Sequence, residues 1–313
     1  MKTKTWLGIV LGICLASSVI AADEDCDYYN GLEVVVQKAP RVVTNAVQTV
    51  VIKSTYIRDS SLIGEYDQPE WTEHRRFPTT RCYLQQEPGE IGVEQWIRSE
   101  FNKGERATHR VQSEAEIGLP GRMQADFYIN SEIEKTGTYY YDNFAMELRY
   151  ALADWGVIPL NPTLYGEYKI KDTDRGADVG EVKVLIGDQF GNGWAWAYNL
   201  AYEWDLWGDE QAEELGHCFG LSKTIIDRKL SLGVEGRYTS ETVKGERDNP
   251  EKCLNVGPSI QWRPVINSHI DLCPLIGVTK NAPDLMTYLV IGYDFGGATH
   301  TSKSVSPIGA RSN

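Results

Sequence analysis

The chain has 313 residues with 44 acidic and 31 basic side chains, a net charge of −13. This acidic balance argues against nucleic acid as a partner and against electrostatic docking to anionic lipid. After the first 22 residues no stretch approaches the roughly 20 apolar residues of a membrane helix, so a membrane protein of this sequence would have to cross as a closed barrel.

Residues 1–22 have the pattern of a signal peptide. Lys2 and Lys4 form a basic start, residues 6–16 an apolar run, and residues 19–22 a small-residue cleavage site. We therefore expect export, with residues 1–22 removed.

Residues 23–88 differ in kind from the rest of the chain. They begin with three acidic residues, contain one strand-like run at 47–55, and carry too few apolar residues to bury a core of their own. We expect an N-terminal segment that is periplasmic or plug-like. Its basic cluster of His74, Arg75, Arg76 and Arg81 could fold into an acidic lumen as a plug, or remain periplasmic.

Residues 89–296 repeat one pattern, about ten residues of alternating polar and apolar character followed by a turn. The clearest copy is 194–204, where large side chains occupy one parity and small or polar ones the other. Turn sequences such as Lys135-Thr136-Gly137 separate the copies. The predicted strands are 90–101, 107–119, 123–134, 139–152, 162–171, 177–187, 194–206, 214–225, 229–240, 252–263, 268–278 and 285–295.

The polar parity carries charges at mid-strand in nearly every predicted strand. The candidate lumen-lining residues are Glu94, Arg98, Glu114, Glu116, Asp126, Glu147, Arg149, Glu167, Lys169, Glu181, Lys183, Glu203, Glu235, Arg237, Arg263, Asp271 and Asp294. Acids and bases recur at matched depths, so we expect cross-strand ion pairs between Glu167/Lys169 and Glu181/Lys183.

These features predict an all-β fold: an antiparallel up-and-down transmembrane β-barrel of about 12 strands. The even strand number, the strand length and the 26 Trp and Tyr residues of the chain fit a barrel with aromatic girdles. A secreted soluble β-sandwich is the alternative, but its polar face would not be charged so regularly.

Two prolines, Pro258 and Pro274, fall inside predicted strands, where the ladder needs the N–H that proline lacks. Folding that hairpin about Ile266 places the two prolines nearly opposite each other. They indicate a paired bulge or, alternatively, a weakened seam through which a ligand could pass sideways into the bilayer.

Several stretches resemble one known family: residues 116–126 (EIGLPGRMQAD), 161–167 (NPTLYGE), 257–262 (GPSIQW) and 291–296 (IGYDFG). They are similar to outer-membrane barrel proteins grouped as the phenol meta-degradation pathway family, which are often labelled transporters. The resemblance covers residues 90–296 and implies an outer-membrane location, contact with outer-membrane lipid and passage of small, in some cases aromatic, molecules. The resemblance identifies no catalytic residue in this chain. Assembly machinery for such barrels usually recognises a terminal aromatic residue, whereas here residues 296–313 follow Phe295.

We therefore expect a channel or transporter for a small solute, with a lumen that prefers cations or neutral solutes to anions. A closed structural or interaction barrel is the alternative. An enzyme is less favoured, because the adjacent pairs His217-Cys218 and Ser268-His269 point to opposite faces of a strand. The sequence predicts no catalytic residue, no cofactor and no metal site.

Residues 172–178 mimic the start of a calcium loop but lack its closing Glu, which favours a hairpin turn. The sequence leaves open whether Cys26 and Cys82 form a disulfide.

Overall fold

The computed structural model describes residues 32–33, 53–54, 57–172, 174 and 176–296. The chain divides into two units, residues 1–56 and 57–313. In the first unit, β1 (Leu32–Glu33) pairs antiparallel with β2 (Lys53–Ser54). The expected signal peptide, Cys26, the tail 297–313 and most of the strand-like run 47–55 lie outside the described residues. None of the helices in the described ranges is long and apolar enough to cross a membrane.

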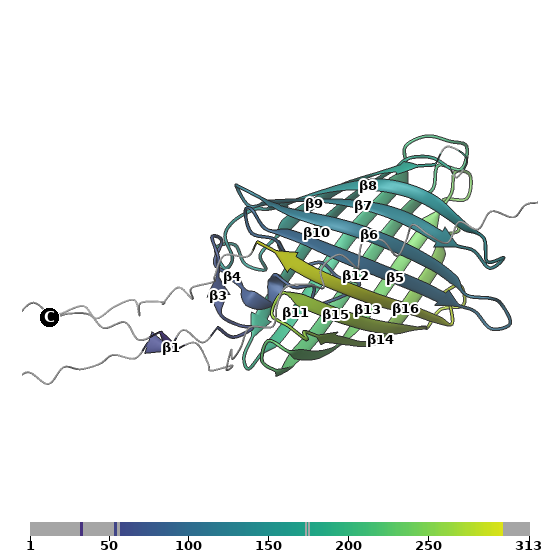
Figure 1. Ribbon diagram of the computed structural model, residues 1–313. Coiled ribbons are helices and arrows are strands. Elements are labelled where there is room, and N and C mark those ends of the chain that lie inside the picture. The colour runs from purple at the N-terminus through teal and green to yellow at the C-terminus, as the bar shows by residue number, and fades with distance from the viewer. Residues whose placement is uncertain (1–31, 34–52, 55–56, 173, 175, 297–313) are drawn as a thin grey trace, which may run out of the picture. The chain divides into compact units, whose positions relative to one another are not determined.

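Twelve antiparallel strands of the second unit close into a barrel, in which each strand pairs with its neighbours in sequence and the last pairs with the first (Figure 1). They are β5 (Ile91–Phe101), β6 (Thr108–Leu119), β7 (Met123–Ile133), β8 (Tyr139–Ala151), β9 (Thr163–Lys171), β10 (Val179–Phe190), β11 (Trp194–Asp205), β12 (Glu213–Ile226), β13 (Leu230–Thr242), β14 (Glu251–Trp262), β15 (Ser268–Gly277) and β16 (Leu285–Phe295). The predicted twelve-stranded barrel is confirmed, and every strand lies close to its predicted bounds.

Burial alternates along each strand because successive side chains point to opposite sides of the wall. In β11, Ala195 and Ala197 are buried while Leu200 and Tyr202 are exposed. The exposed large apolar residues form a band that runs over many strands, including Val93, Ile97, Phe127, Ile129, Leu148, Leu164, Val182, Val184, Leu232, Val234, Val256, Ile260, Leu272 and Ile291. Such a band is stable against lipid and would be an aggregation surface in water.

The connections at the two ends of the barrel differ. The end that carries both barrel termini has turns at 120–122, 191–193 and 227–229, the connection 263–267, and one longer connection, 152–162. The opposite end has connections 102–107, 134–138, 172–178, 206–212, 243–250 and 278–284. Gly137 has φ +84° in one of them, a conformation that glycine adopts without strain. In bacterial barrels the short turns are periplasmic and the longer loops extracellular.

The wall is interrupted between β14 and β15. Residues on either side of the interruption pair in one register, Val256 with Ile276 and Ile260 with Leu272, so that Pro258 lies opposite Pro274. Residues 257–259 and 273–275 have no recorded ladder pairs across this seam. Because the register does not shift, neither strand carries an extra residue relative to the other across the interruption.

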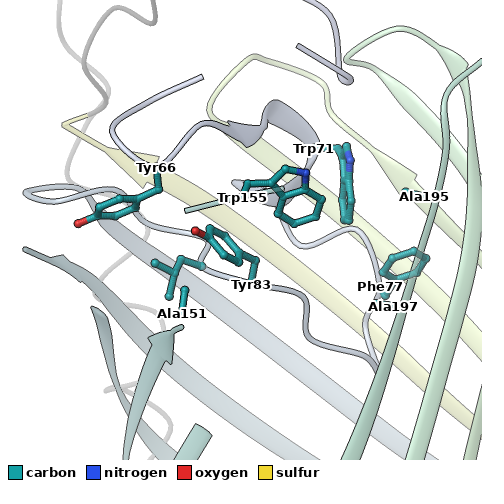
Figure 2. Packing of buried hydrophobic residues seen from close by; sticks show 9 residues of the cluster. Tyr66, Trp71, Phe77, Tyr83, Ala151, Trp155, Ala195 and Ala197 are labelled. Atoms are coloured by element: carbon teal, nitrogen blue, oxygen red, sulfur yellow. The ribbon is translucent and has the colours of Figure 1, made fainter. Parts of the chain in front are cut away.

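Residues 57–88, called the inner segment below, contain β3 (Leu62–Ile63), β4 (Gln68–Pro69) and the 3-10 turn η1 (Glu70–Thr72). Its aromatic residues pack with one another and against the barrel (Figure 2). Trp71 contacts Phe77 and Trp155 edge to face, with ring centroids 6.3 and 5.9 Å apart. The remaining members of this cluster are Tyr66, Tyr83, Leu84, Ala151, Ala195 and Ala197. The segment therefore buries its few apolar side chains by sharing a core with β8, β11 and the connection 152–162.

Glycines in the wall make room for the inner segment. A Cβ at Gly220 of β12 would lie 2.5 Å from Cδ1 of Phe77, and one at Gly187 of β10 would lie 2.5 Å from Sγ of Cys82. Both distances are far below van der Waals contact, so only glycine fits at these two points. Cys82 is a free thiol, and burial raises its pKa well above the usual range.

Candidate functional site

The inner segment meets the barrel through buried arginines. Arg75 Nε donates to Glu94 at 2.8 Å and its Nη2 donates to Glu116 at 3.0 Å. Arg81 Nη2 donates to Glu114 at 3.2 Å. Both guanidinium groups lie over the ring of Trp96, at 4.3 and 5.2 Å from its centroid. Two cations of the inner segment thus lie among carboxylates that project from β5 and β6.

The barrel contributes one cation of its own to this group. Arg149 is fully buried on β8, donates to Asp126 at 2.7 Å and also contacts Glu147. Its Nη1 donates to Oε1 of Gln85 on the inner segment at 2.9 Å. The resulting buried network holds five carboxylates and three guanidinium groups: Glu94, Glu114, Glu116, Asp126, Glu147, Arg75, Arg81 and Arg149.

A second contact zone lies nearer the barrel termini. Glu70 of η1 accepts from Arg263 at 2.8 Å and from Arg228 at 2.9 Å. Although burial acts to raise it, these cations hold the pKa of Glu70 below its usual range. Asp59 accepts from the Thr224 hydroxyl at 2.8 Å, and burial together with the nearby Glu70 charge raises its pKa to about 6.

Two further groups of the inner segment reach the wall. His74 Nδ1 lies 2.9 Å from Asp294 of β16. Arg76 donates to Ser222 at 2.7 Å and to Thr224 at 3.0 Å, both on β12. All four basic residues of the cluster noted in the sequence therefore bond side chains of the barrel.

Beyond the inner segment the interior opens into a cavity of about 550 Å³, called the vestibule below. Pro78, Thr79 and Arg81 line its base. Its wall extends to Asp205, the last residue of β11, and to Ala212, the last residue of the connection 206–212. It therefore lies on the side of the inner segment that faces the end opposite the barrel termini. Its walls carry both charges and aromatic rings, among them Lys169, Glu181, Lys183, Glu203, Arg237 and Tyr288.

The predicted pairing of charges on β9 and β10 is seen in the vestibule wall. Lys169 lies 3.4 Å from Glu181 and 3.7 Å from Glu167, and Lys183 lies 3.1 Å from Glu181. Lys169 also contacts Glu203 of β11. The group has three carboxylates and two ammonium groups, so the vestibule wall carries both signs with a small acidic excess.

None of the candidate lumen-lining residues is exposed on the outside. Those that are buried are Glu94, Glu114, Glu116, Asp126, Glu147, Arg149, Glu181, Glu235, Arg263 and Asp271, and those of intermediate burial are Arg98, Glu167, Lys169, Lys183, Glu203, Arg237 and Asp294. Sequence reasoning missed Asp59, Glu70, Gln85 and Trp96. Nothing in the spacing of the first three marks them, since only the path of the inner segment brings them to the barrel. Trp96 shares the inward parity of Glu94 and Arg98, and that parity could have placed it in the lumen.

Two sets of carboxylates lie close enough together to hold a cation, Glu94/Glu114/Glu116 and Glu114/Asp126/Glu147. Guanidinium groups already bond most of these carboxylates. The donor set is therefore balanced by side chains, and it does not fit a resident metal ion.

The histidine pairs named for an enzyme do not form a nucleophile–base contact. His269 is buried between Asp271 and Glu94, and His217 contacts Tyr198 at 2.7 Å. One Ser–His contact does occur, Ser99 Oγ to His109 Nδ1 at 2.8 Å. In the described part of the chain no carboxylate is seen bonded to His109, so the third member of a triad is not in place. Residues 172–178 connect β9 to β10, as the hairpin-turn interpretation predicts.

No protein-family model matches this chain, and neither does any curated protein. Among solved structures it is similar to the COG4313 outer membrane channel from Pseudomonas putida F1, with 11% identity, a TM-score of 0.50, and coverage of 68% of this chain and 97% of that one. It is also similar to the NanC porin, with 11% identity, a TM-score of 0.45, and coverage of 66% and 99%. At these identities the similarity concerns the fold. The chain has the fold of bacterial outer-membrane channels.

Proposed function

We propose that this protein is an outer-membrane channel for small molecules, whose inner segment closes the lumen below the vestibule and must move before solutes pass. One observation carries the proposal: Arg75 and Arg81 pair with Glu94, Glu114 and Glu116 directly beneath a cavity that ends on the inner segment. The inner segment acts as the plug, with His74, Arg75, Arg76 and Arg81 as its basic contacts.

The register of the barrel supports this role. Glu94 lies opposite Glu114 across β5 and β6, and Asp126 lies opposite both Glu116 and Glu147. Like charges directly opposite each other destabilise a sheet. The inner segment brings two of the three cations that compensate this repulsion, so the barrel is electrostatically complete only when the segment is docked.

The finer assignments belong to the same proposal. The strand and turn sequences quoted above resemble those of the phenol meta-degradation family, and this resemblance favours small, in some cases aromatic, solutes. The apolar outer band would contact outer-membrane lipid. Assembly machinery would recognise β16, whose last residue is Phe295.

Bilayer conductance tests the proposal. The wild type should be mostly closed with rare openings, and Arg81→Gln should raise the open probability. Removing this cation leaves Glu114 with Arg75 alone, 3.9 Å away. Removing one partner of a buried ion pair typically costs about 3–5 kcal/mol, which favours undocking. Lys135→Gln is the control, because Lys135 and Glu105 are about half exposed and a surface pair is worth about 0–1 kcal/mol.

The outcomes separate the two candidate functions. An open probability raised by Arg81→Gln and unchanged by Lys135→Gln supports a plugged channel. If both variants fold, judged by a shift in electrophoretic mobility on boiling, yet no variant conducts, the channel is contradicted. The closed structural barrel then remains. The buried network that fills the lower half of the lumen is the observation that favours that second candidate.

A further inference from the structure

The seam between β14 and β15 lacks hydrogen bonding at its middle. Pro258 and Pro274 occupy opposite positions, and both lack the N–H that a ladder requires. Pro258 shares the outward parity of the exposed Ile260, and Pro274 that of the exposed Leu272. The other edge of each strand stays paired, Pro258 with Val234 and Pro274 with Thr287. The interruption is thus confined to one seam and faces lipid.

The interior behind this seam is apolar on the β15 side, whereas β14 presents Asn255 and Ser259 and β13 presents Glu235. Cys273 and Leu275 flank Pro274 in the sequence, point inward and are fully buried. They belong to a cluster with Trp96, Met286, Tyr288 and Val290, called the wall cluster below. The inward parity of β5 to β8 carries charge at mid-strand instead, with Glu94, Glu114, Asp126 and Glu147.

The wall cluster also borders the vestibule. Trp96 and Tyr288 line the vestibule as well as belonging to the cluster. The inner segment covers the cluster from within, because Arg75 and Arg81 lie over Trp96. Thr79 N–H donates to Glu235, beside the seam, at 2.8 Å. A path from the vestibule outwards therefore passes first the wall cluster, then the paired prolines, and then reaches lipid.

We propose that the β14–β15 seam is a lateral portal, through which small uncharged apolar molecules pass between the vestibule and the outer-membrane bilayer. The proposal goes beyond the channel function, which concerns passage along the barrel axis. Opening the seam breaks no proline hydrogen bond, because none exists there. An apolar molecule gains by burial in the wall cluster, whereas a charged one would lose its hydration there. The portal therefore selects uncharged apolar compounds.

The test restores the missing donors. In Pro258→Val/Pro274→Val both strands regain an N–H at the interruption and can complete the ladder. Ile260→Val/Leu272→Val is the matched control, since this pair faces lipid on the same two strands and is already in register. The readout is the rate at which N-phenyl-1-naphthylamine becomes fluorescent in intact Gram-negative cells, whose outer leaflet otherwise excludes it. Conductance of the same purified proteins is measured in parallel.

We expect cells with the wild type or the control to take up the probe several-fold faster than cells without the protein, and the double valine variant to lose most of that gain. Equal uptake by the valine variant and the wild type overturns the portal, as does a wild type no faster than empty cells. Conductance reports separately on the axial channel. If the protein does not conduct but uptake still depends on the seam, the axial channel is contradicted and the portal is supported.

Hydrogen exchange of the wild type needs no variant and covers the case in which the double variant does not fold. Peptides from 255–262 and 270–277 should exchange faster than peptides from the regularly paired β10 and β11. Equal protection of the two seams would overturn the portal.

Discussion

At the scale of single residues, the interior is arranged by charge balance and by space. Glu116 lies opposite Asp126, and Arg75, which donates to the first, and Arg149, which donates to the second, relieve this repulsion. Space is equally restrictive at Gly220, where the ring of Phe77 occupies the position of a side chain. Nothing in the residue type of Glu116, Asp126 or Gly220 distinguishes it from other strand residues. The role of each follows from the group that packs against it.

Gly220→Ala should therefore weaken docking of the inner segment. Its Cβ would collide with Phe77, and overpacking of this kind costs about 1–3 kcal/mol. Trypsin should then cut faster at Arg75, Arg76 and Arg81, which are buried or half-buried in the wild type.

Gly216→Ala is the matched control, because it lies on the same strand and parity and its Cβ would make an ordinary contact of 3.4 Å with Ala201. Equal cleavage rates for the two variants would show that Phe77 moves aside freely.

At the scale of elements, the inner segment depends on the barrel for its core. Its apolar side chains pack on Ala151, Ala195 and Ala197 of the wall, and its charged ones bond β5, β6, β12 and β16. Docking is consequently sensitive to the protonation of groups it buries. His74 is one such group and faces Glu70, Asp294, Arg263 and the ring of His269.

Docking should weaken as the pH falls below about 6.5. Burial lowers the pKa of His74 and Arg263 lowers it further, which outweighs Asp294 and Glu70. The undocked histidine, with its usual pKa of 6.5, then binds more protons than the docked one, so protonation favours release. The loss of docking free energy is at most about 1.4 kcal/mol per pH unit. It vanishes above about pH 6.5, where the undocked histidine is also neutral.

The measurement is the difference in thermal midpoint between the wild type and His74→Gln as the pH is lowered. Wild type should lose stability relative to the variant only on the acidic side. Asp59, whose pKa burial raises to about 6, acts in the opposite sense but is common to both proteins and cancels in the difference. A constant difference across the range would rule out His74 as the sensitive group.

At the scale of the whole molecule, the lumen has two halves, and a glutamate has a different role in each. Glu147 belongs to the buried network under the vestibule, where it contacts Arg149 and lies 4.0 Å from Arg81. Glu181 lines the vestibule and pairs with Lys169 and Lys183. A charge in the first half supports the packing, and one in the second is open to passing solutes.

Glu147→Gln and Glu181→Gln should therefore behave differently. Glu147→Gln should lower the free energy of unfolding by about 3–5 kcal/mol, as expected when one partner of a buried ion pair is removed. Glu181→Gln should change stability less but shift the reversal potential in a salt gradient towards anions. An unchanged reversal potential in a conducting protein would remove Glu181 from the selectivity residues.

The sequence by itself determined the barrel. Strict alternation with a charged inner parity has one stable solution in a membrane, and turn residues such as Gly137 set the strand ends. It also placed Pro258 opposite Pro274, because a hairpin of known turn fixes the register.

Only the tertiary structure decided what fills the barrel. The path of residues 57–88 has no periodicity, so the contacts of Glu70 with Arg263 or of Phe77 with Gly220 could not be read from spacing. The same holds for the wall cluster, whose members come from β5, β15 and β16. Local alternation encodes which face a strand residue takes, whereas contacts between distant segments depend on closure of the barrel around a segment with no regular pattern of its own.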